Sequence, residues 1–110
     1  MAKRETIPTV VYNIIRKARE LKKALEHYEE PYCEITQNER GVRVDVRLPA
    51  VKKRSINLRM NSRKMEIRGE NGRKNFYKLI DIPSIVDITK ARAVYTKETL
   101  RVMLPYYRAL

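Results

Sequence analysis

Few side chains in this sequence have the chemistry that catalysis needs. The chain has one histidine, His27, and one cysteine, Cys33, and neither has a further Cys or His at metal-site spacing. Three aspartates, Asp45, Asp81 and Asp87, fall in or beside separate expected strands, and the three glycines fall at expected turns and form no phosphate-binding loop. We therefore expect no enzyme, no catalytic residue, no cofactor and no metal.

The basic residues offer a different chemistry, the binding of anions. Twenty-five Lys and Arg oppose thirteen Asp and Glu, a net charge of +12. Such an excess is found in nucleic-acid-binding proteins and also on solvated, charge-rich surfaces. We favour the solvated surface because the charges are spread between strands. Nucleic acid remains an alternative partner, through a predicted basic set comprising Lys52, Lys53, Arg54, Arg59, Arg63, Lys64, Arg68, Arg73 and Lys74, with only Phe76 and Tyr77 nearby for base stacking.

The composition predicts one cytoplasmic domain. A chain of 110 residues is of ordinary domain size, and no apolar run is long enough to cross a membrane. The opening "MAKRETIP" has no apolar stretch behind its charges, so it does not resemble a secretory signal. A lone cysteine is typical of a reducing compartment.

Residues 9–30 have the spacing of an amphipathic helix. Apolar residues recur every three or four positions and make one stripe, and Pro31 ends the segment. We expect an N-terminal helical region over residues 1–31, outside the main domain. Its stripe would pack on the same domain, on another subunit or on an unfolded client.

From Tyr32 onward the apolar period changes to two. "VRVDVRL" is the clearest strand, and similar alternation recurs in "YCEITQN", "SINLRM", "KMEIRG", "KNFYKLIDI" and the hairpin "ARAVYTKETLRVMLP". Asn71-Gly72 predicts a type I′ hairpin turn. About seven short strands with turns between them indicate an all-β antiparallel sandwich over residues 32–105, followed by a short tail, residues 106–110.

The last hairpin resembles the signature of the α-crystallin domain of small heat-shock proteins, "AxAxY", a turn, then "vLxvxlP". The matching residues are Ala91, Ala93, Tyr95, Leu100, Val102, Leu104 and Pro105. Three further segments, "RLPAVKKRSINLRM", "KMEIRGE" and "KLIDIPSIVD", resemble family motifs in the same order. The resemblance spans about residues 32–105 and implies an immunoglobulin-like sandwich.

Three departures from the family pattern suggest a short archaeal or bacterial-like member. Glu98 stands where the family has a turn glycine, so either the turn is strained or it has another shape. Asn71-Gly72 leaves no room for the strand that many relatives exchange. The tail "YYRAL" lacks the Ile-x-Ile motif that links subunits into large cages.

The resemblance implies an ATP-independent chaperone, or holdase, acting in the stress response on partly unfolded proteins. The expected client or partner contacts are Val11, Ile14, Ile15, Leu21, Leu25, Ile56, Leu58 and Met60, although the last three also suit a core. We expect a homodimer or small homo-oligomer and no membrane partner. The expected dimer edge lies in an extended edge strand over residues 73–82 and comprises Phe76, Tyr77, Lys78, Leu79 and Ile80. The alternative function is a CS-type co-chaperone or adaptor domain.

Overall fold

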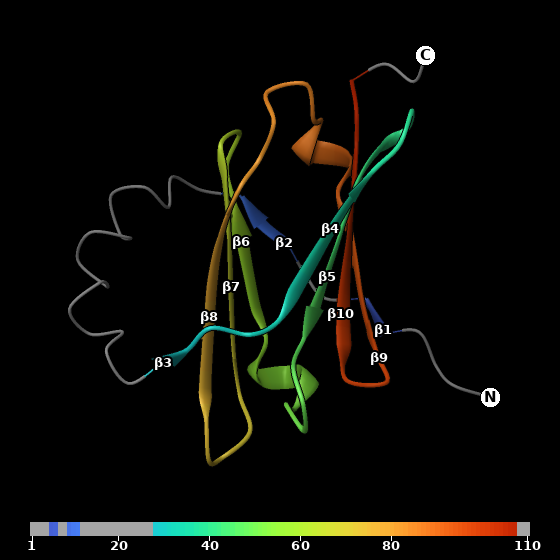
Figure 1. Cartoon of the computed structure of the whole chain (residues 1–110). Coiled ribbons are helices and arrows are strands. Elements are labelled where there is room, and N and C mark those ends of the chain that lie inside the picture. Colours follow the sequence, from blue (N-terminus) through green and yellow to red (C-terminus); the bar gives the residue numbers. More distant parts are fainter. Residues whose placement is uncertain (1–4, 7–8, 12–27, 108–110) are drawn as a thin grey trace.

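The computed structural model describes residues 5–6, 9–11 and 28–107, which form a two-layered β-sandwich (Figure 1). One layer, sheet A, has the strand order β1 (Glu5–Thr6), β9 (Arg92–Thr96), β10 (Thr99–Pro105), β5 (Gly41–Arg47) and β4 (Cys33–Gln37). The other layer, sheet B, has the order β2 (Thr9–Val11), β6 (Asn57–Met60), β7 (Lys64–Glu70), β8 (Asn75–Asp81) and β3 (Tyr28–Glu29). The seven strands from residue 33 onward pair antiparallel, so the predicted sandwich is confirmed.

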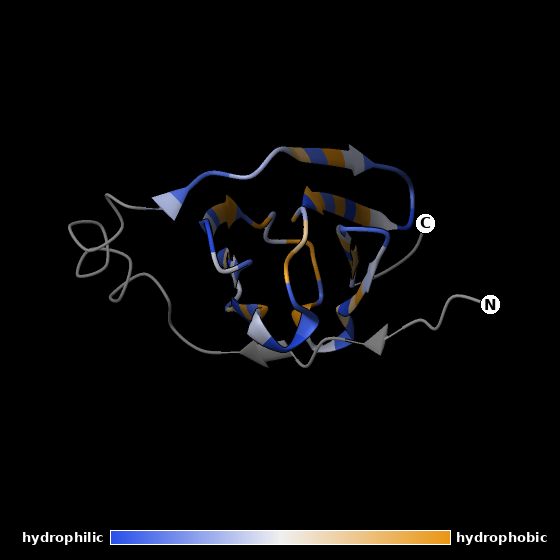
Figure 2. Cartoon of the chain, turned by 90° about the horizontal axis from the view of Figure 1, so that it is seen from below, coloured by the Kyte–Doolittle hydropathy of each residue, from blue (hydrophilic) through white to orange (hydrophobic). Residues whose placement is uncertain are grey.

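The core lies between the sheets and follows the predicted alternation. In sheet A, Val44 of β5 faces Val102 of β10 across the ladder, and both side chains are fully buried. In sheet B, Leu58, Met65 and Ile67 are buried in the same cluster. The view along the strands shows the resulting alternation of apolar and polar bands (Figure 2). Burial of these apolar faces provides the main stabilisation of the two layers.

The predicted N-terminal helix is wrong at both of its ends. Thr9–Val11 form β2, which pairs parallel with β6, and Tyr28–Glu29 form β3, which pairs parallel with β8. Residues 12–27, which hold the rest of the prediction, lie outside the described part of the chain. The edges of sheet B offer unpaired backbone groups, and pairing with them outweighs the local helical pattern.

The turn between β7 and β8 joins the two strands directly, as predicted, but it is not type I′. Gly72 has a φ of 87°, whereas Asn71 is not among the residues with positive φ. The Asn71 side-chain oxygen instead accepts hydrogen bonds from the backbone N–H groups of Arg73 (2.9 Å) and Lys74 (2.8 Å). This four-residue connection leaves no exchanged strand between β7 and β8.

The turn between β9 and β10 has positive φ at both central residues, Lys97 (49°) and Glu98 (63°), the pattern of a type I′ turn. Of the two shapes predicted for this turn, a strained turn or a different one, the structure therefore has the strained turn. Glu98 holds the turn against the loop after β5, because its carboxylate accepts a hydrogen bond from Ala50 N at 2.6 Å. Its carbonyl oxygen also accepts one from Leu48 N at 2.8 Å.

Candidate functional site

No group of His, Cys, Asp or Glu side chains suited to holding a metal occurs among residues 28–107. Cys33 is half-buried, and this burial raises the pKa of its thiol and so disfavours the reactive thiolate. His27 lies outside the described residues. Within the part of the chain that the structure describes, no helix is long and apolar enough to span a membrane.

The expected dimer edge, β8, is next to the end of sheet B. It pairs with β7 along its whole length, whereas β3 pairs only with its first two residues, Asn75 and Phe76. Within the described residues, no other strand pairs with the outer edge of β8, which is open from Lys78 to Asp81. Its apolar side chains fall on two faces as predicted: Phe76 and Ile80 are buried, and Tyr77 and Leu79 are half-buried. Lys78 is half-buried on the core-facing side.

Backbone bonds at the ends of the β7–β8 ladder show which groups of β8 face outward. Lys74 O accepts from Asn71 N, and Ile82 N donates to Arg63 O, so these two pairs are hydrogen-bonded. Hydrogen-bonded pairs alternate in an antiparallel ladder, so the N–H groups of Tyr77 and Leu79 face away from β7. The N–H of Leu79 lies beyond β3, on the open part of the edge. The N–H of Lys78 faces β7.

Side chains hold β3 against this edge. Glu30 forms an ion pair with Lys78, and Glu29 forms one with Lys74 at 3.2 Å. The Tyr28 hydroxyl accepts a hydrogen bond from Arg68 Nη2 at 3.1 Å, and the Tyr28 ring lies edge-on to Tyr77, with 6.3 Å between ring centres. The ion pairs are partly solvent-exposed, so salt screens them and each contributes little.

The opposite edges of the sandwich are covered by the start of the chain. β1 pairs antiparallel with β9 in sheet A, matching Glu5 to Tyr95 and Thr6 to Val94. β2 pairs parallel with β6 in sheet B, matching Thr9 to Leu58. Residues 5–6 therefore lie at the edge of one sheet and residues 9–11 at the edge of the other (Figure 1).

Three of the expected client-contact residues belong to the core. Ile56, Leu58 and Met60 retain only 8%, 1% and 0% of their accessible surface and pack in the central cluster. They are not exposed in the folded chain. The role of the remaining expected contacts stays a prediction, because the structure does not describe their side chains. These residues are Val11, Ile14, Ile15, Leu21 and Leu25.

Other large apolar side chains are exposed, and the sequence reasoning missed them. They are Tyr32, Ile35, Ile85, Met103 and Tyr107. Ile35 is the most informative: its register opposite Val44 puts it on the core-facing side of β4, yet it is 53% exposed. β4 ends sheet A, and only a knowledge of strand order reveals that a correctly alternating residue lies at an open rim.

No family model and no curated protein sequence matches the chain. Solved structures do match. Heat shock protein 16.0 from Schizosaccharomyces pombe aligns with a TM-score of 0.68 and 26% identity over 74% of this chain and 91% of that one. HSP18.5 from E. histolytica aligns with a TM-score of 0.67 and 17% identity over 74% of this chain and 92% of that one. A small heat-shock protein from Xylella fastidiosa aligns with a TM-score of 0.64 and 17% identity over 73% of this chain and 88% of that one.

Proposed function

We propose that the chain is a member of the small heat-shock protein family, a family of chaperones, and that it acts as an ATP-independent holdase. In this role it binds partly unfolded proteins and keeps them from aggregating, with no catalytic step. The proposal includes a homodimer or small homo-oligomer, and it places the activity in the cytoplasm.

The observation that carries the proposal is the shortness of the strands covering the sheet edges. Within the described residues, β1 and β3 have two residues each and β2 has three, and they cover the edges of β9, β8 and β6. A cover this short adds few backbone hydrogen bonds, so its detachment costs little. An extended, unfolded segment pairs with a sheet edge through the same backbone groups. Edges of this kind therefore suit reversible binding of unfolded chains.

Exposed apolar side chains at the rim add the second requirement of a holdase. Ile35 lies on β4, whose outer edge has no partner among the described strands, and Tyr32 just before β4 is 67% exposed. Apolar surface at an open edge contacts apolar segments of a client while the edge pairs with its backbone. Ile35 is thus the residue on which the proposal is tested.

The test is suppression of heat-induced aggregation of a client enzyme without ATP, followed by light scattering. Ile35→Lys should lower the protection, because it places a charge where an apolar contact forms. Thr36→Lys is the matched control, since Thr36 is also exposed on β4 but points to the other face. Equal protection by both variants would remove Ile35 from the client surface. No protection by the wild-type protein at any ratio would favour the CS-type adaptor, which the direct β7–β8 turn also fits.

The dimer is proposed to form through the open part of β8, and its test follows from the ladder. Leu79→Pro removes an outward N–H and should lower the mass measured in solution to that of a monomer. Leu79→Ala shortens the same side chain but keeps the donor, so it should remain dimeric. A folded Leu79→Pro protein with the wild-type mass would place the subunit contact elsewhere.

A further inference from the structure

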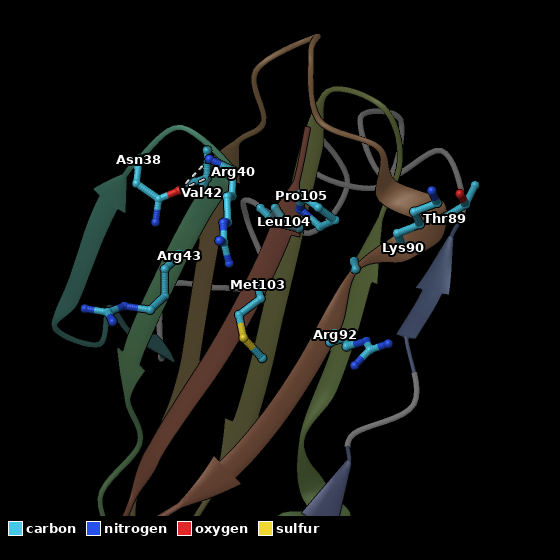
Figure 3. Close-up of a pocket in the computed structure, with 12 residues that line it drawn as sticks. Asn38, Arg40, Val42, Arg43, Thr89, Lys90, Arg92, Met103, Leu104 and Pro105 are labelled. Atoms are coloured by element: carbon cyan, nitrogen blue, oxygen red, sulfur yellow. Dashed lines mark hydrogen bonds between the residues drawn. The ribbon is translucent and has the colours of Figure 1, made fainter. Parts of the chain in front are cut away.

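A hollow of about 810 Å³ lies on the outer face of sheet A. Its floor is formed by β5, β10 and β9, where Met103 has Arg43 and Arg92 as its cross-strand neighbours. One wall is the turn before β5, with Asn38 and Arg40, and the other is the 3₁₀ turn Ile88–Lys90 (Figure 3). Three segments that are distant in the sequence thus bound one concave surface.

The hollow is lined by four cationic side chains and no carboxylate. Arg40, Lys90 and Arg92 are exposed, and within the described part of the chain none of their side chains forms a hydrogen bond or ion pair. Arg43 pairs with Asp45 at 3.3 Å, and Asp45 also accepts from Arg101 at 2.9 Å, so this carboxylate is shared between two guanidinium groups. The field inside the hollow is therefore positive, and concave surfaces strengthen such a field.

Apolar and aromatic surface accompanies these charges. Met103 at the floor is 38% exposed. Tyr107, two residues after the lining residue Pro105, is 62% exposed, and the preceding Tyr106 N donates to Arg40 O at 2.9 Å, which ties this segment to the wall of the hollow. Proteins that bind single strands combine cations, which contact phosphates, with an exposed aromatic ring, on which a base stacks.

The predicted basic set is less suited to this chemistry. Lys64 pairs with Asp81, Lys74 pairs with Glu29, and Arg68 packs on Tyr28. Lys53 and Arg59 also have partners. Charges already engaged in the folded protein bind a phosphate only by giving up those partners. The other members, Lys52, Arg54, Arg63 and Arg73, have no side-chain partner in the described structure, but they do not line the hollow. The hollow, which the sequence did not reveal, brings three unpaired cations to one concave surface.

We propose that this hollow binds single-stranded nucleic acid, with Arg40, Lys90 and Arg92 on phosphates and Tyr107 against a base. Arg40 precedes β5 and Arg92 lies on β9, and these two strands are about 10 Å apart because β10 runs between them, so the two cations contact separate phosphates of one strand. A site walled on both sides admits a flexible strand, whereas duplex recognition uses a protruding element that enters a groove. The site is separate from the β8 edge and from Ile35.

The experiment is fluorescence anisotropy on the full chain with a labelled single-stranded RNA of about 12 nucleotides at about 150 mM KCl. The variant R40Q/K90Q/R92Q empties the hollow of its free cations. The variant K52Q/R54Q/R73Q removes the same charge from three exposed residues of the predicted basic set, whose side chains form no hydrogen bond or ion pair within the described structure. Circular dichroism confirms that both are folded.

The hollow variant should bind at least about tenfold more weakly, and its slope of log K against log salt should fall by about 2, since each lost phosphate contact contributes about 0.7. The control variant should stay within about threefold of wild type, because its cations lie outside the hollow. Tyr107→Ala should weaken binding by at least about fivefold with the salt slope unchanged, because stacking releases no counterions.

Three results would overturn the proposal. Equal losses of RNA affinity in the two triple variants would show that binding depends on net charge alone. Equal affinity for a duplex of the same length would contradict a single-strand site. Competition by polyglutamate as effective as that of unlabelled RNA would instead identify an acidic protein segment as the ligand.

Discussion

Substitutions in the β9–β10 turn separate backbone strain from a side-chain contact. Glu98 has a φ of 63°, in the left-handed region, where a residue with a Cβ atom costs about 1 kcal/mol more than glycine. Its carboxylate accepts a hydrogen bond from Ala50 N at an exposed position, which contributes about 1 kcal/mol. Glu98→Ala loses the contact and keeps the strain, so it should destabilise the protein by about 1 kcal/mol. Glu98→Gly loses both, so its stability should stay near that of wild type.

Lys97, the other central residue of the turn, provides the comparison for Glu98. Its φ is 49°, and within the described chain its side chain has no hydrogen bond or ion pair. Lys97→Gly therefore relieves strain without losing a contact and should stabilise the protein by about 1 kcal/mol, or about 4 °C in Tm for a chain of this size.

The assay is urea unfolding followed by far-UV circular dichroism, with the same m-value required of all variants. Two outcomes would refute the reasoning in different ways. Equal stability of Glu98→Ala and Glu98→Gly would show that the turn carries no strain. A gain for Glu98→Gly as large as that for Lys97→Gly would show that the bond to Ala50 contributes nothing.

Three further predictions concern the core and its titrating groups. The Tyr95 hydroxyl donates to the carbonyl oxygens of Leu48 (2.7 Å) and Val51 (3.0 Å), and burial raises its pKa. The unfolded chain therefore loses the Tyr95 proton at a lower pH than the folded protein, so stability should fall as pH rises above 10.0, the ordinary tyrosine pKa. The fall should be smaller in Tyr95→Phe, and urea unfolding midpoints measured on both sides of pH 10.0 check this. Cys33 should react with iodoacetamide more slowly in the folded protein than in urea at neutral pH, because burial raises its thiol pKa; equal rates would contradict its placement. Leu58→Ala should cost about 3 kcal/mol of unfolding free energy because the side chain is 1% exposed, and a loss below about 1 kcal/mol would mean that Leu58 is not a core residue.

The sequence alone determined the strands from residue 32 onward and the residues that face the core. Val42, Val44 and Val46 alternate with polar residues, and a half-buried strand converts that local period directly into an inner and an outer face. The same alternation correctly assigned Phe76 and Ile80 to one face of β8 and Tyr77 and Leu79 to the other. These features depend only on neighbouring residues, which is why they are readable without a structure.

Tertiary structure decided the features that depend on a distant partner. Val10 and Val11 fit a helical stripe, but they lie in a strand because the edge of β6 supplies backbone partners. Asn71-Gly72 has the local preference for a type I′ turn, yet the two consecutive residues with positive φ are Lys97 and Glu98. Glu98 accepts a hydrogen bond from Ala50, which lies 48 positions earlier in the chain. A local preference of about 1 kcal/mol is outweighed by such contacts.

The hollow on sheet A depends on the fold in the same way. Arg40, Lys90 and Arg92 come from two segments separated by 50 residues, and the register of β5, β10 and β9 brings those segments to one concave face. Charge in the sequence indicates that anions are attracted, because net charge is a sum over residues. Where they bind is decided by strand order, since only the pairing of non-adjacent strands determines which cations are neighbours and which already have a partner.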